Sequence, residues 1–350
     1  MGKHTPITVL VAGLGRSGWN VHVNRLKSDS RFKITAAVDR IEDRRQEAQE
    51  TLGCAVFARL EDALRAKSAE LAIICTYSAD HATHAIAALE AGCHVVVEKP
   101  AALSARELDS EIAAVGKARR ILAVSKLYEY PETNSTPFVR EIMGSKVLGK
   151  ILWVKRSGLQ FWHRQDWQTA KRLGGGIVNN LIIACMEDYL QLLGSPVARV
   201  WGHTRRTVSG GDAEDFAKVS LVGKNGRLVE IEMSYSCATP QAEWMVCGTT
   251  GALTVTGETA TMRFFDPKLA GRVRPRRHSS PSRSYGVSER LPWQEMTVKV
   301  ESKRPKADFY DALYRAIREG KAIPGRPESM REAMRVVDLI RRQADTTKNR

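Results

Sequence analysis

The feature that most constrains the fold of this chain is a glycine-rich turn near its N-terminus. An apolar strand is predicted over residues 6–11, the run GLGRSG follows at residues 13–18, and a helical segment begins near residue 19. Glycine allows a tight turn at the first position, a close approach of a ligand at the second, and close packing of helix on strand at the third. GxGxxG also arises by chance in glycine-rich turns, but here it lies between a strand and a helix, which is the context that gives it meaning.

Strands and helices alternate through the first 125 residues of the chain. Each predicted strand is short and apolar, and one of the helices ends at Gly92, where glycine can close a helix in the left-handed conformation. Such alternation indicates right-handed βαβ crossovers, a parallel sheet and therefore a doubly wound Rossmann domain. The predicted strands cover residues 6–11, 32–38, 71–76, 94–98 and 121–125, and the predicted helices that follow cover residues 41–52, 79–91 and 105–118.

The end of the second predicted strand indicates which ligand this domain takes. The N-terminus of the first helix faces the glycine turn, and its amides and partial positive charge suit a pyrophosphate. A carboxylate about 20 residues after the last glycine accepts hydrogen bonds from the ribose of NAD, whereas a guanidinium just after the strand holds the 2′-phosphate of NADP. We therefore expect NAD or NADP, and we interpret Arg44 and Arg45 as a solvated helix face. The candidate cofactor residues here are Gly13, Gly15, Arg16, Ser17, Gly18, Asp39 and Arg40.

The sequence pattern changes near residue 128. Short stretches of alternating polar and apolar residues follow one another, which indicates a largely antiparallel sheet. We expect two domains: a Rossmann domain over residues 1–127, and an α+β domain for substrate binding and oligomerisation over residues 128–350, with a large, open, mainly antiparallel sheet. Its predicted strands cover 149–158, 198–207, 217–222, 227–237, 244–248 and 252–255, its helices 179–193, 306–319 and 328–345, and a long mobile loop 266–292.

Charge and composition limit the classes of partner. The formal net charge of +15 suggests an anionic ligand, but the surplus is dispersed except at the C-terminus and in residues 263–290. No nucleic-acid recognition motif accompanies it, so we do not favour a nucleic-acid partner and interpret 263–290 as a solvated loop. Recruitment of an anionic substrate and docking to an acidic partner or nucleic acid are the alternatives for this segment. No stretch approaches the roughly 18 apolar residues of a membrane helix, and no secretory signal precedes the first strand. We expect a soluble, cytoplasmic protein with free thiols, and no metal, because its histidines and cysteines show no HxH, HExxH or CxxC spacing.

The most specific motif of the chain is AGCHVVVEKP at residues 91–100. It resembles the AGxHVxxEKP signature of the Gfo/Idh/MocA oxidoreductases, named for glucose-fructose oxidoreductase, inositol dehydrogenase and a rhizopine-catabolism protein. VLGK at 147–150 resembles the family's entry to the second domain, and DWQ at 166–168 precedes the glycine triplet 174–176 as in one subgroup. The resemblance implies hydride transfer between a nicotinamide and the carbinol or carbonyl carbon of a sugar, inositol or related small polar substrate. It also implies a homodimer or homotetramer formed through the open sheet.

The resemblance assigns roles to residues around this motif. It makes Lys99 the catalytic lysine, with Pro100 in the cis form that directs it toward the nicotinamide, and it adds Glu98 to the cofactor site. Thr76 and His81, in the place of the family's TPxxxH segment, join the cofactor site in the same way. The chemistry agrees, because oxidation of an alcohol requires a group that takes or shares its proton and a positive charge that stabilises the developing alkoxide.

The helix after the glycine triplet departs from the family pattern. Most members read D/N-x-G-x-H-x-x-D there, with the histidine as acid or base and the aspartate at the substrate. Counting from Gly176 places Asn180 at the first position, Ala184 at the histidine and Glu187 at the aspartate. Because these positions are spaced i, i+4 and i+7, they share one helix face, so Asn180 and Glu187 remain candidate catalytic and substrate residues although the imidazole is missing.

Three hypotheses account for the missing imidazole. In the first, another group handles the proton: Lys99, which we favour, or Glu187, Tyr128 or His163. In the second, the protein binds cofactor and ligand without robust turnover, as a sensor or scaffold, since loss of a general base costs roughly 10²–10⁴ in rate. In the third, it reduces an imine or an enone. Trp167 joins Tyr128 and His163 as a substrate candidate, because aromatic side chains suit the apolar face of a sugar, although they are as often local core.

Overall fold

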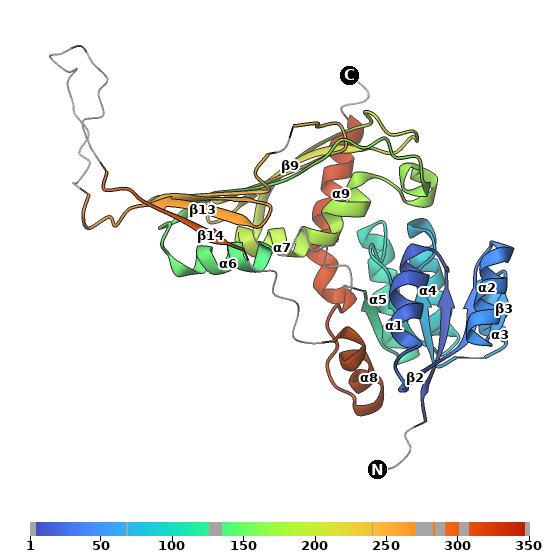
Figure 1. The fold of residues 1–350 in the computed structure, drawn as a ribbon. Helices are drawn as coiled ribbons and strands as arrows, with labels where there is room; N and C mark the ends of the chain where they lie inside the picture. Colours follow the sequence, from blue (N-terminus) through green and yellow to red (C-terminus); the bar gives the residue numbers. More distant parts are fainter. Residues whose placement is uncertain are drawn as a thin grey trace.

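Two sheets carry the architecture of the chain (Figure 1). The computed structural model describes residues 5–67, 69–125, 135–239, 241–270, 283, 291–300 and 308–346. A six-stranded parallel sheet lies in the N-terminal part, and an eight-stranded, mainly antiparallel sheet lies in the C-terminal part. The predicted fold class, a Rossmann domain joined to an α+β domain with a large open sheet, is confirmed.

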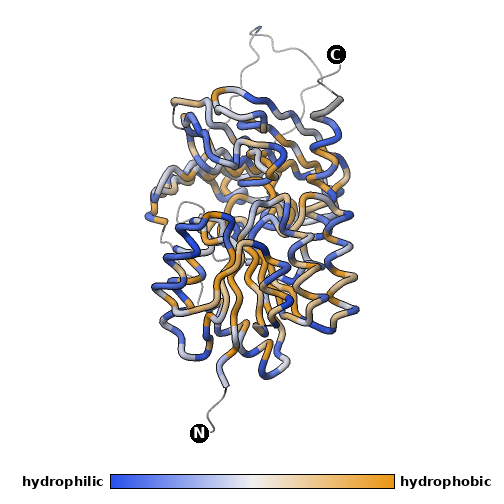
Figure 2. Tube along the Cα trace, turned by 90° about the vertical axis from the view of Figure 1, so that its right-hand side faces the viewer, coloured by the Kyte–Doolittle hydropathy of each residue, from blue (hydrophilic) through white to orange (hydrophobic). Residues whose placement is uncertain are grey.

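The first sheet has the strand order β3-β2-β1-β4-β5-β6. All of its strand pairs are parallel. From β1 the chain adds strands first on one side, to β3, and then on the other, from β4 to β6, so the order reverses between β1 and β4. Doubly wound sheets bind their ligands at this point. Figure 2 shows the apolar residues concentrated in these central strands and the hydrophilic ones on the helices around them. The strands are β1 (Ile7–Ala12), β2 (Phe32–Val38), β3 (Ala55–Phe57), β4 (Leu71–Ile74), β5 (His94–Val97) and β6 (Leu122–Val124).

Helices cover both faces of this sheet, because successive side chains of each strand point to opposite sides. Leu10 of β1 belongs to one apolar core, with residues of α3, α4 and α5, whereas Val9 and Val11 belong to the other. The helices of the first face are α3 (Leu60–Arg65), α4 (His81–Glu90) and α5 (Ala105–Ala118). Those of the second are η1 (Arg16–Val23), α1 (Asn24–Leu26), α2 (Glu42–Leu52) and α8 (Phe309–Glu319).

Helix α8 connects the C-terminal part of the chain to the first sheet. Tyr310 and Leu313 are fully buried and share a core with Ile7 and Ile73. Asp308 caps the helix, since its carboxylate accepts the backbone N–H of Tyr310 at 2.9 Å. The expected domain boundary near residue 127 stays a prediction, but the last part of the chain packs in both halves of the molecule.

The second sheet has the strand order β14-β13-β12-β11-β7-β10-β9-β8. Its β7 and β10 pair in parallel, and every other pair is antiparallel. One face is covered by α6 (Ser135–Ser145), α7 (Ile183–Leu193) and α9 (Arg331–Thr346), and Figure 1 shows no helix of the described residues on the opposite face. The strands are β7 (Ile151–Leu159), β8 (Val197–Arg205), β9 (Phe216–Gly223), β10 (Leu228–Ser234), β11 (Trp244–Gly248), β12 (Gly251–Thr256), β13 (Thr259–Phe264) and β14 (Gln294–Lys299).

Several elements differ from the sequence-based expectation. The strands β3, β13 and β14 and the helices α3 and α6 have no predicted counterpart. The helix expected over 179–193 begins with a π-helical turn, η6 (Val178–Ile182), before α7. Residues 271–282 and 284–290 of the basic segment lie outside the described residues, and Arg263 at its start pairs with Glu295 across β13 and β14 at 3.2 Å. In the part of the chain that is described, no helix has the length and apolarity needed to cross a membrane.

Candidate active site

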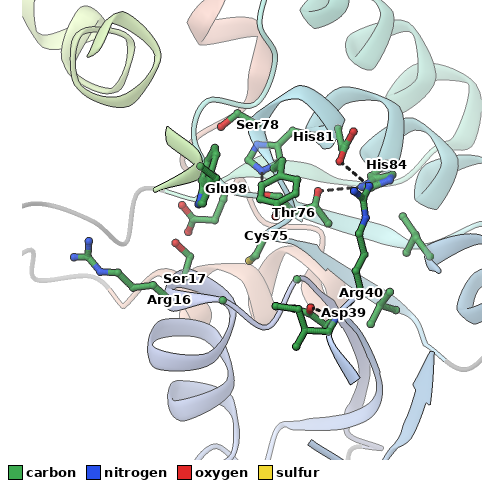
Figure 3. A pocket seen from close by; sticks show the side chains of 18 of the residues that line it. Arg16, Ser17, Asp39, Arg40, Cys75, Thr76, Ser78, His81, His84 and Glu98 are labelled. Carbon is green, nitrogen blue, oxygen red and sulfur yellow. Dashed lines mark hydrogen bonds and ion pairs between the residues drawn. The ribbon is translucent and has the colours of Figure 1, made fainter. Parts of the chain in front are cut away.

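A cleft of about 830 Å³ lies at the carboxyl edge of the six-stranded sheet. It spans the point between β1 and β4 where the strand order reverses, and a segment of the second half of the chain forms its outer wall. Figure 3 shows Arg16 and Ser17 on one side of this cleft and Asp39 and Arg40 on the other. Thr76, His81 and Glu98 lie between these two pairs, so the structure gathers predicted cofactor residues from four separate parts of the sequence.

The glycine turn has the geometry of a phosphate cradle. Gly13 has a φ of +91°, and a Cβ there would lie 2.3 Å from the carbonyl oxygen of Cys75. A Cβ at Gly18 would lie 1.8 Å from the carbonyl oxygen of Gly13, so helix and turn touch through glycine alone. A Cβ at Gly15 would meet nothing closer than Arg44 Nη1 at 3.8 Å, because this residue faces the cleft. The first amides of η1 therefore open onto free space that suits a pyrophosphate.

Asp39 organises the end of the cleft beside β2. The carboxylate is buried and accepts the backbone N–H of Leu14 at 2.7 Å and of Ile41 at 2.9 Å, so it fastens the glycine turn to the loop after β2. Arg44 lies 3.4 Å from the same carboxylate and lines the cleft, which corrects the interpretation of Arg44 as a solvated helix residue. Arg45 donates to the backbone carbonyls of Asp39 and Arg40 at 2.9 and 3.0 Å.

Arg40 is held over the cleft by two neighbours. Its guanidinium lies 3.3 Å from the Asp80 carboxylate and 5.7 Å from the ring centre of Tyr77. The cleft here is lined by guanidinium groups of Arg40, Arg44 and Arg59 together with the carboxylates of Asp39 and Asp80. A ribose and a 2′-phosphate both find partners in such a set, so the alternative between NAD and NADP stays open.

His81 fixes the loop that carries the EKP motif. Its Nδ1 lies 2.8 Å from the carbonyl oxygen of Pro100, and its Nε2 lies 3.0 Å from the carbonyl oxygen of Thr76. Burial lowers the pKa of His81, whereas the two carbonyl oxygens, which both accept, oppose that shift. The ring therefore lies between the ends of β4 and β5 and contacts both of them. The Lys99–Pro100 peptide is cis, which confirms the implication of the resemblance.

Lys99 lies at the inner end of the cleft. Its Nζ donates to the carbonyl oxygen of Asn180 at 2.9 Å, so the helix after the glycine triplet touches the lysine through its backbone. Burial lowers the pKa of Lys99, the Glu98 carboxylate opposes this, and the guanidinium groups of Arg16 and Arg164 add to the lowering. The ammonium is therefore partly desolvated among further positive charges, which suits a group that gives up a proton more readily than a surface lysine.

The outer wall of the cleft comes from the segment after β7. Arg164, Asp166, Trp167 and Gln168 line the cleft, and the ring of Trp167 lies 5.3 Å from that of Tyr77. Arg164 is fixed by Asp166 at 2.6 Å and by the hydroxyl of Tyr235 at 3.2 Å.

The glycine triplet brings this wall close to the first sheet. Gly174 has a φ of +77°, and a Cβ there would lie 2.7 Å from the backbone nitrogen of Ala79. The triplet therefore allows the wall to approach η2 (Ser78–Asp80), the turn that precedes α4.

Helix α7 places the candidates around Ala184 in different surroundings. Ala184 is exposed, and Glu187 is half-buried. The strongest electrostatic partner of Lys99 on this helix is Cys185, a position that the sequence motif does not single out. Asn180 meets Lys99 through its main-chain carbonyl.

The remaining candidates separate into two groups. Trp167 lines the cleft, as a substrate residue requires, whereas His163 is exposed, outside the cleft lining, with its ring 5.3 Å from that of Phe161. Tyr128 lies outside the described residues. Sequence reasoning missed lining residues that carry no family motif, and for Arg164 the signal was its place two residues before the DWQ run. The missed lining residues include Cys75, Tyr77, Ser78, Asp80, His84 and Arg164.

Comparison with known proteins decides the family. The family model described as an oxidoreductase family with an NAD-binding Rossmann fold matches residues 7–126, and the GFO/IDH/MocA C-terminal domain matches residues 138–254. The chain belongs to the Gfo/Idh/MocA oxidoreductase family. Its cofactor is a nicotinamide dinucleotide, and the open glycine turn, the amides of η1 and the polar end at Asp39 fit that molecule.

Individual relatives of this Gfo/Idh/MocA protein are distant. A D-glucoside 3-dehydrogenase of Escherichia coli is 26% identical over 56% of this chain and 56% of its own length. A putative UDP-kanosamine synthase oxidoreductase subunit of Amycolatopsis mediterranei is 24% identical over 95% of this chain and 94% of its own. The WlbA dehydrogenase of Bordetella pertussis, solved with NADH and UDP-GlcNAcA, superposes with a TM-score of 0.73 at 20% identity, over 98% of each chain. The family thus includes sugar-related dehydrogenases, and the solved structure supports the fold.

Proposed function

We propose that this family member catalyses hydride transfer between NAD(P) and a carbinol or carbonyl carbon of a sugar, inositol or related polar substrate. The observation that carries the proposal is the position of Lys99, a desolvated ammonium at the inner end of a cleft whose glycine turn suits a pyrophosphate. Both curated relatives are named for sugar-related oxidoreductase activities, which supports the substrate class.

Lys99 acts as the general acid in reduction and as the general base in oxidation. The bound nicotinamide supplies or accepts the hydride. The Lys99 ammonium gives its proton to the oxygen of a carbonyl substrate in reduction and, as an amine, takes it back from the alcohol in oxidation. The Asn180 carbonyl, 2.9 Å from Nζ, fixes the direction of the side chain, and the positive charge stabilises an alkoxide.

Charge at the inner end of the cleft favours a substrate with a negatively charged group. The positive charges of Arg16 and Arg164 lower the pKa of Lys99, and the carboxylate of Glu98 raises it. A sugar acid or a nucleotide-linked sugar would add the negative charge that this end attracts. Neutral polyols of the same size should therefore bind more weakly than their carboxylated or phosphorylated counterparts.

The test is a turnover assay with a matched pair of lysine variants. Nicotinamide absorbance is followed with NAD, NADP and their reduced forms against polyols, glucosides, sugar acids and nucleotide-linked sugars. Wild-type protein should turn over at least one of them. Lys99→Met should lower kcat by roughly 10²–10⁴ and leave NADH binding within about twofold, whereas Lys99→Arg should keep the charge and bind anionic substrates better than Lys99→Met does. Equal turnover by wild type and Lys99→Met would refute the role of the lysine.

A second candidate function rests on Ala184. Its exposed methyl stands at the position where the resemblance expects an imidazole, so a cofactor-binding protein without robust turnover, or a reductase of an imine or enone, fits the same cleft. Ala184→His separates the candidates. A large gain in polyol oxidation indicates decayed catalysis, whereas good wild-type turnover abolished in Lys99→Met indicates a site that works without the histidine.

We also propose that the face of the second sheet opposite α6, α7 and α9 is the contact surface of a homodimer or homotetramer. Trp201 on β8 is 52% exposed there, and its ring stacks on that of His203 with centres 6.4 Å apart. Large exposed aromatic side chains on an uncovered sheet face are typical of protein contact surfaces. Light scattering after size-exclusion chromatography measures the mass directly, and a monomer at micromolar concentration would contradict this assignment.

A further inference from the structure

A buried chain of hydrogen bonds runs beneath the floor of the cleft. The hydroxyl of Tyr310 contacts Nδ1 of His22, and Nε2 of His22 lies 2.9 Å from Oε1 of Glu98. Tyr310 and His22 are fully buried, and Glu98 is 4% exposed. The three residues come from α8, from η1 and from the end of β5, so the chain links the C-terminal helix to the residue before Lys99.

The charge of Glu98 sets the direction of its hydrogen bond with His22. Burial alone would raise the pKa of Glu98, but interactions with His22, the hydrogen bond from Ser125 and the charge of Lys99 outweigh it and lower that pKa from its usual value. The ionised carboxylate accepts, so Nε2 of His22 carries the hydrogen of this bond. Burial raises the pKa of Tyr310 well above its usual value, so its hydroxyl keeps its proton beside Nδ1 of His22.

Glu98 presents its other oxygen to the cleft. Oε1 is engaged by His22, Ser125 is a further hydrogen-bonding neighbour of the carboxylate, and Glu98 lines the cleft in Figure 3. A hydroxyl or amide donor of a bound ligand would meet an acceptor there. The titratable groups that face Glu98 are His22 of η1, Cys75 after β4, His81 of α4, Lys99 and Tyr310 of α8.

We infer that His22 and Tyr310 are positioning residues that keep Glu98 as an ionised, fixed acceptor for the nicotinamide half of the cofactor. The cofactor site is then incomplete until α8 is docked, although α8 contributes no lining residue to the cleft. This inference rests on the proposed function, because it takes the cleft as the cofactor site.

The experiment measures the pH dependence of NADH binding rather than its strength at one pH. Dissociation constants are determined by fluorescence titration between about pH 5.5 and about pH 8, for wild type, Tyr310→Phe, His22→Gln and His22→Leu. Gln at position 22 can still donate an N–H toward Glu98, whereas Leu cannot. The matched control is Tyr314→Phe, one turn further along α8, because the Tyr314 ring contacts Phe32 and Arg31 and takes no part in the chain.

The inference predicts a graded series. Wild type and Tyr314→Phe should change affinity by less than about twofold over this range, since Glu98 stays ionised. His22→Leu should bind roughly 10- to 100-fold more weakly at the acid end than at the basic end, because a hydrogen bond to a charged group is worth about 1.5–3 kcal/mol. Tyr310→Phe should lose about three- to tenfold at the acid end, and His22→Gln should stay close to wild type.

Two outcomes distinguish a failure of this inference from a failure of the proposed function. If wild-type protein binds neither NADH nor NADPH, the proposed function fails. If wild type binds but His22→Leu and Tyr310→Phe keep the pH profile of wild type, the residues are merely structural and the inference fails. Circular dichroism identifies a variant that does not fold, and in that case the less disruptive Tyr310→Phe decides, because it removes a single oxygen atom.

Discussion

Glu111 should make the stability of this protein fall as the pH rises toward neutrality. The side chain is fully buried on α5, on the face that also buries Leu108 and Ala114. Neither carboxyl oxygen has a hydrogen-bond partner among the described residues. Burial, with a smaller contribution from Glu107, raises the pKa of Glu111 from 4.5 to about 8.

The magnitude follows from the difference between the folded and unfolded chains. Between pH 4.5 and about 8 the folded protein keeps the Glu111 proton, whereas the unfolded chain has lost it. The free energy of unfolding therefore falls with pH across that window, by about 1.4 kcal/mol per pH unit from this group. The total is about 5 kcal/mol, of which about 3 kcal/mol is lost by pH 7. Below the pKa of Glu111 in the unfolded chain, its full contribution to the free energy of unfolding is present. Above the pKa of Glu111 in the folded protein, that free energy falls no further on account of this group.

Urea unfolding at about pH 5, 6, 7 and 8 tests this with two variants. Glu111→Gln keeps the size of the side chain but cannot titrate, so its advantage over wild type should grow by roughly 3 kcal/mol from the acid to the basic end of the series. Glu47→Gln is the control, since Glu47 is exposed on α2 and its replacement should change stability by less than about 0.5 kcal/mol at every pH. A constant difference between Glu111→Gln and wild type across the series would refute the reasoning.

Three further predictions concern the cleft and the sheet. Arg40→Ala should weaken NADPH binding about five- to tenfold and change NADH binding less than about twofold, as measured by calorimetry; an equal effect on both would show that no 2′-phosphate meets this guanidinium. Gly174→Ala should lower the free energy of unfolding by roughly 1–3 kcal/mol in urea, because of its positive φ and the 2.7 Å approach to Ala79; an unchanged midpoint would contradict the close packing. Trp201→Glu should shift the mass in light scattering to that of a monomer, and an unchanged mass would place the oligomer contact elsewhere.

Local signals explain which elements could be predicted from the sequence. The bounds of β2 and α5 match the expectation, because β2 is an apolar run between turns and α5 begins after Ser104, whose hydroxyl accepts the N–H of Glu107 at 3.2 Å. Strand β3 has three residues, too few for a periodic pattern, and β13 and β14 flank the long basic segment in which the sequence shows no periodicity. The parallel pairing of β7 with β10 depends on contacts between distant segments, which a pattern of one strand cannot reveal.

The site divides in the same way. The turn glycines, Asp39 and the EKP motif follow strands, so their meeting at one edge of the sheet was predictable. Arg164 and Tyr77 reach the cleft because two halves of the chain pack together, and no local pattern records that. Tyr310, the partner of His22 on α8, is 288 residues away in the sequence, so a local sequence pattern could not predict this hydrogen bond.

The most direct test of the account is the affinity of the cleft for NADH when one glycine is changed. A Cβ at Gly15 would meet nothing closer than Arg44 Nη1 at 3.8 Å, so we expect Gly15→Val to fold with an unchanged melting temperature while its methyl groups extend toward the place of the pyrophosphate. Calorimetry should show NADH or NADPH binding to wild type, and binding at least about tenfold weaker to Gly15→Val. Equal affinities for both proteins, or no heat with wild type, would contradict the claim that this turn holds a nicotinamide dinucleotide.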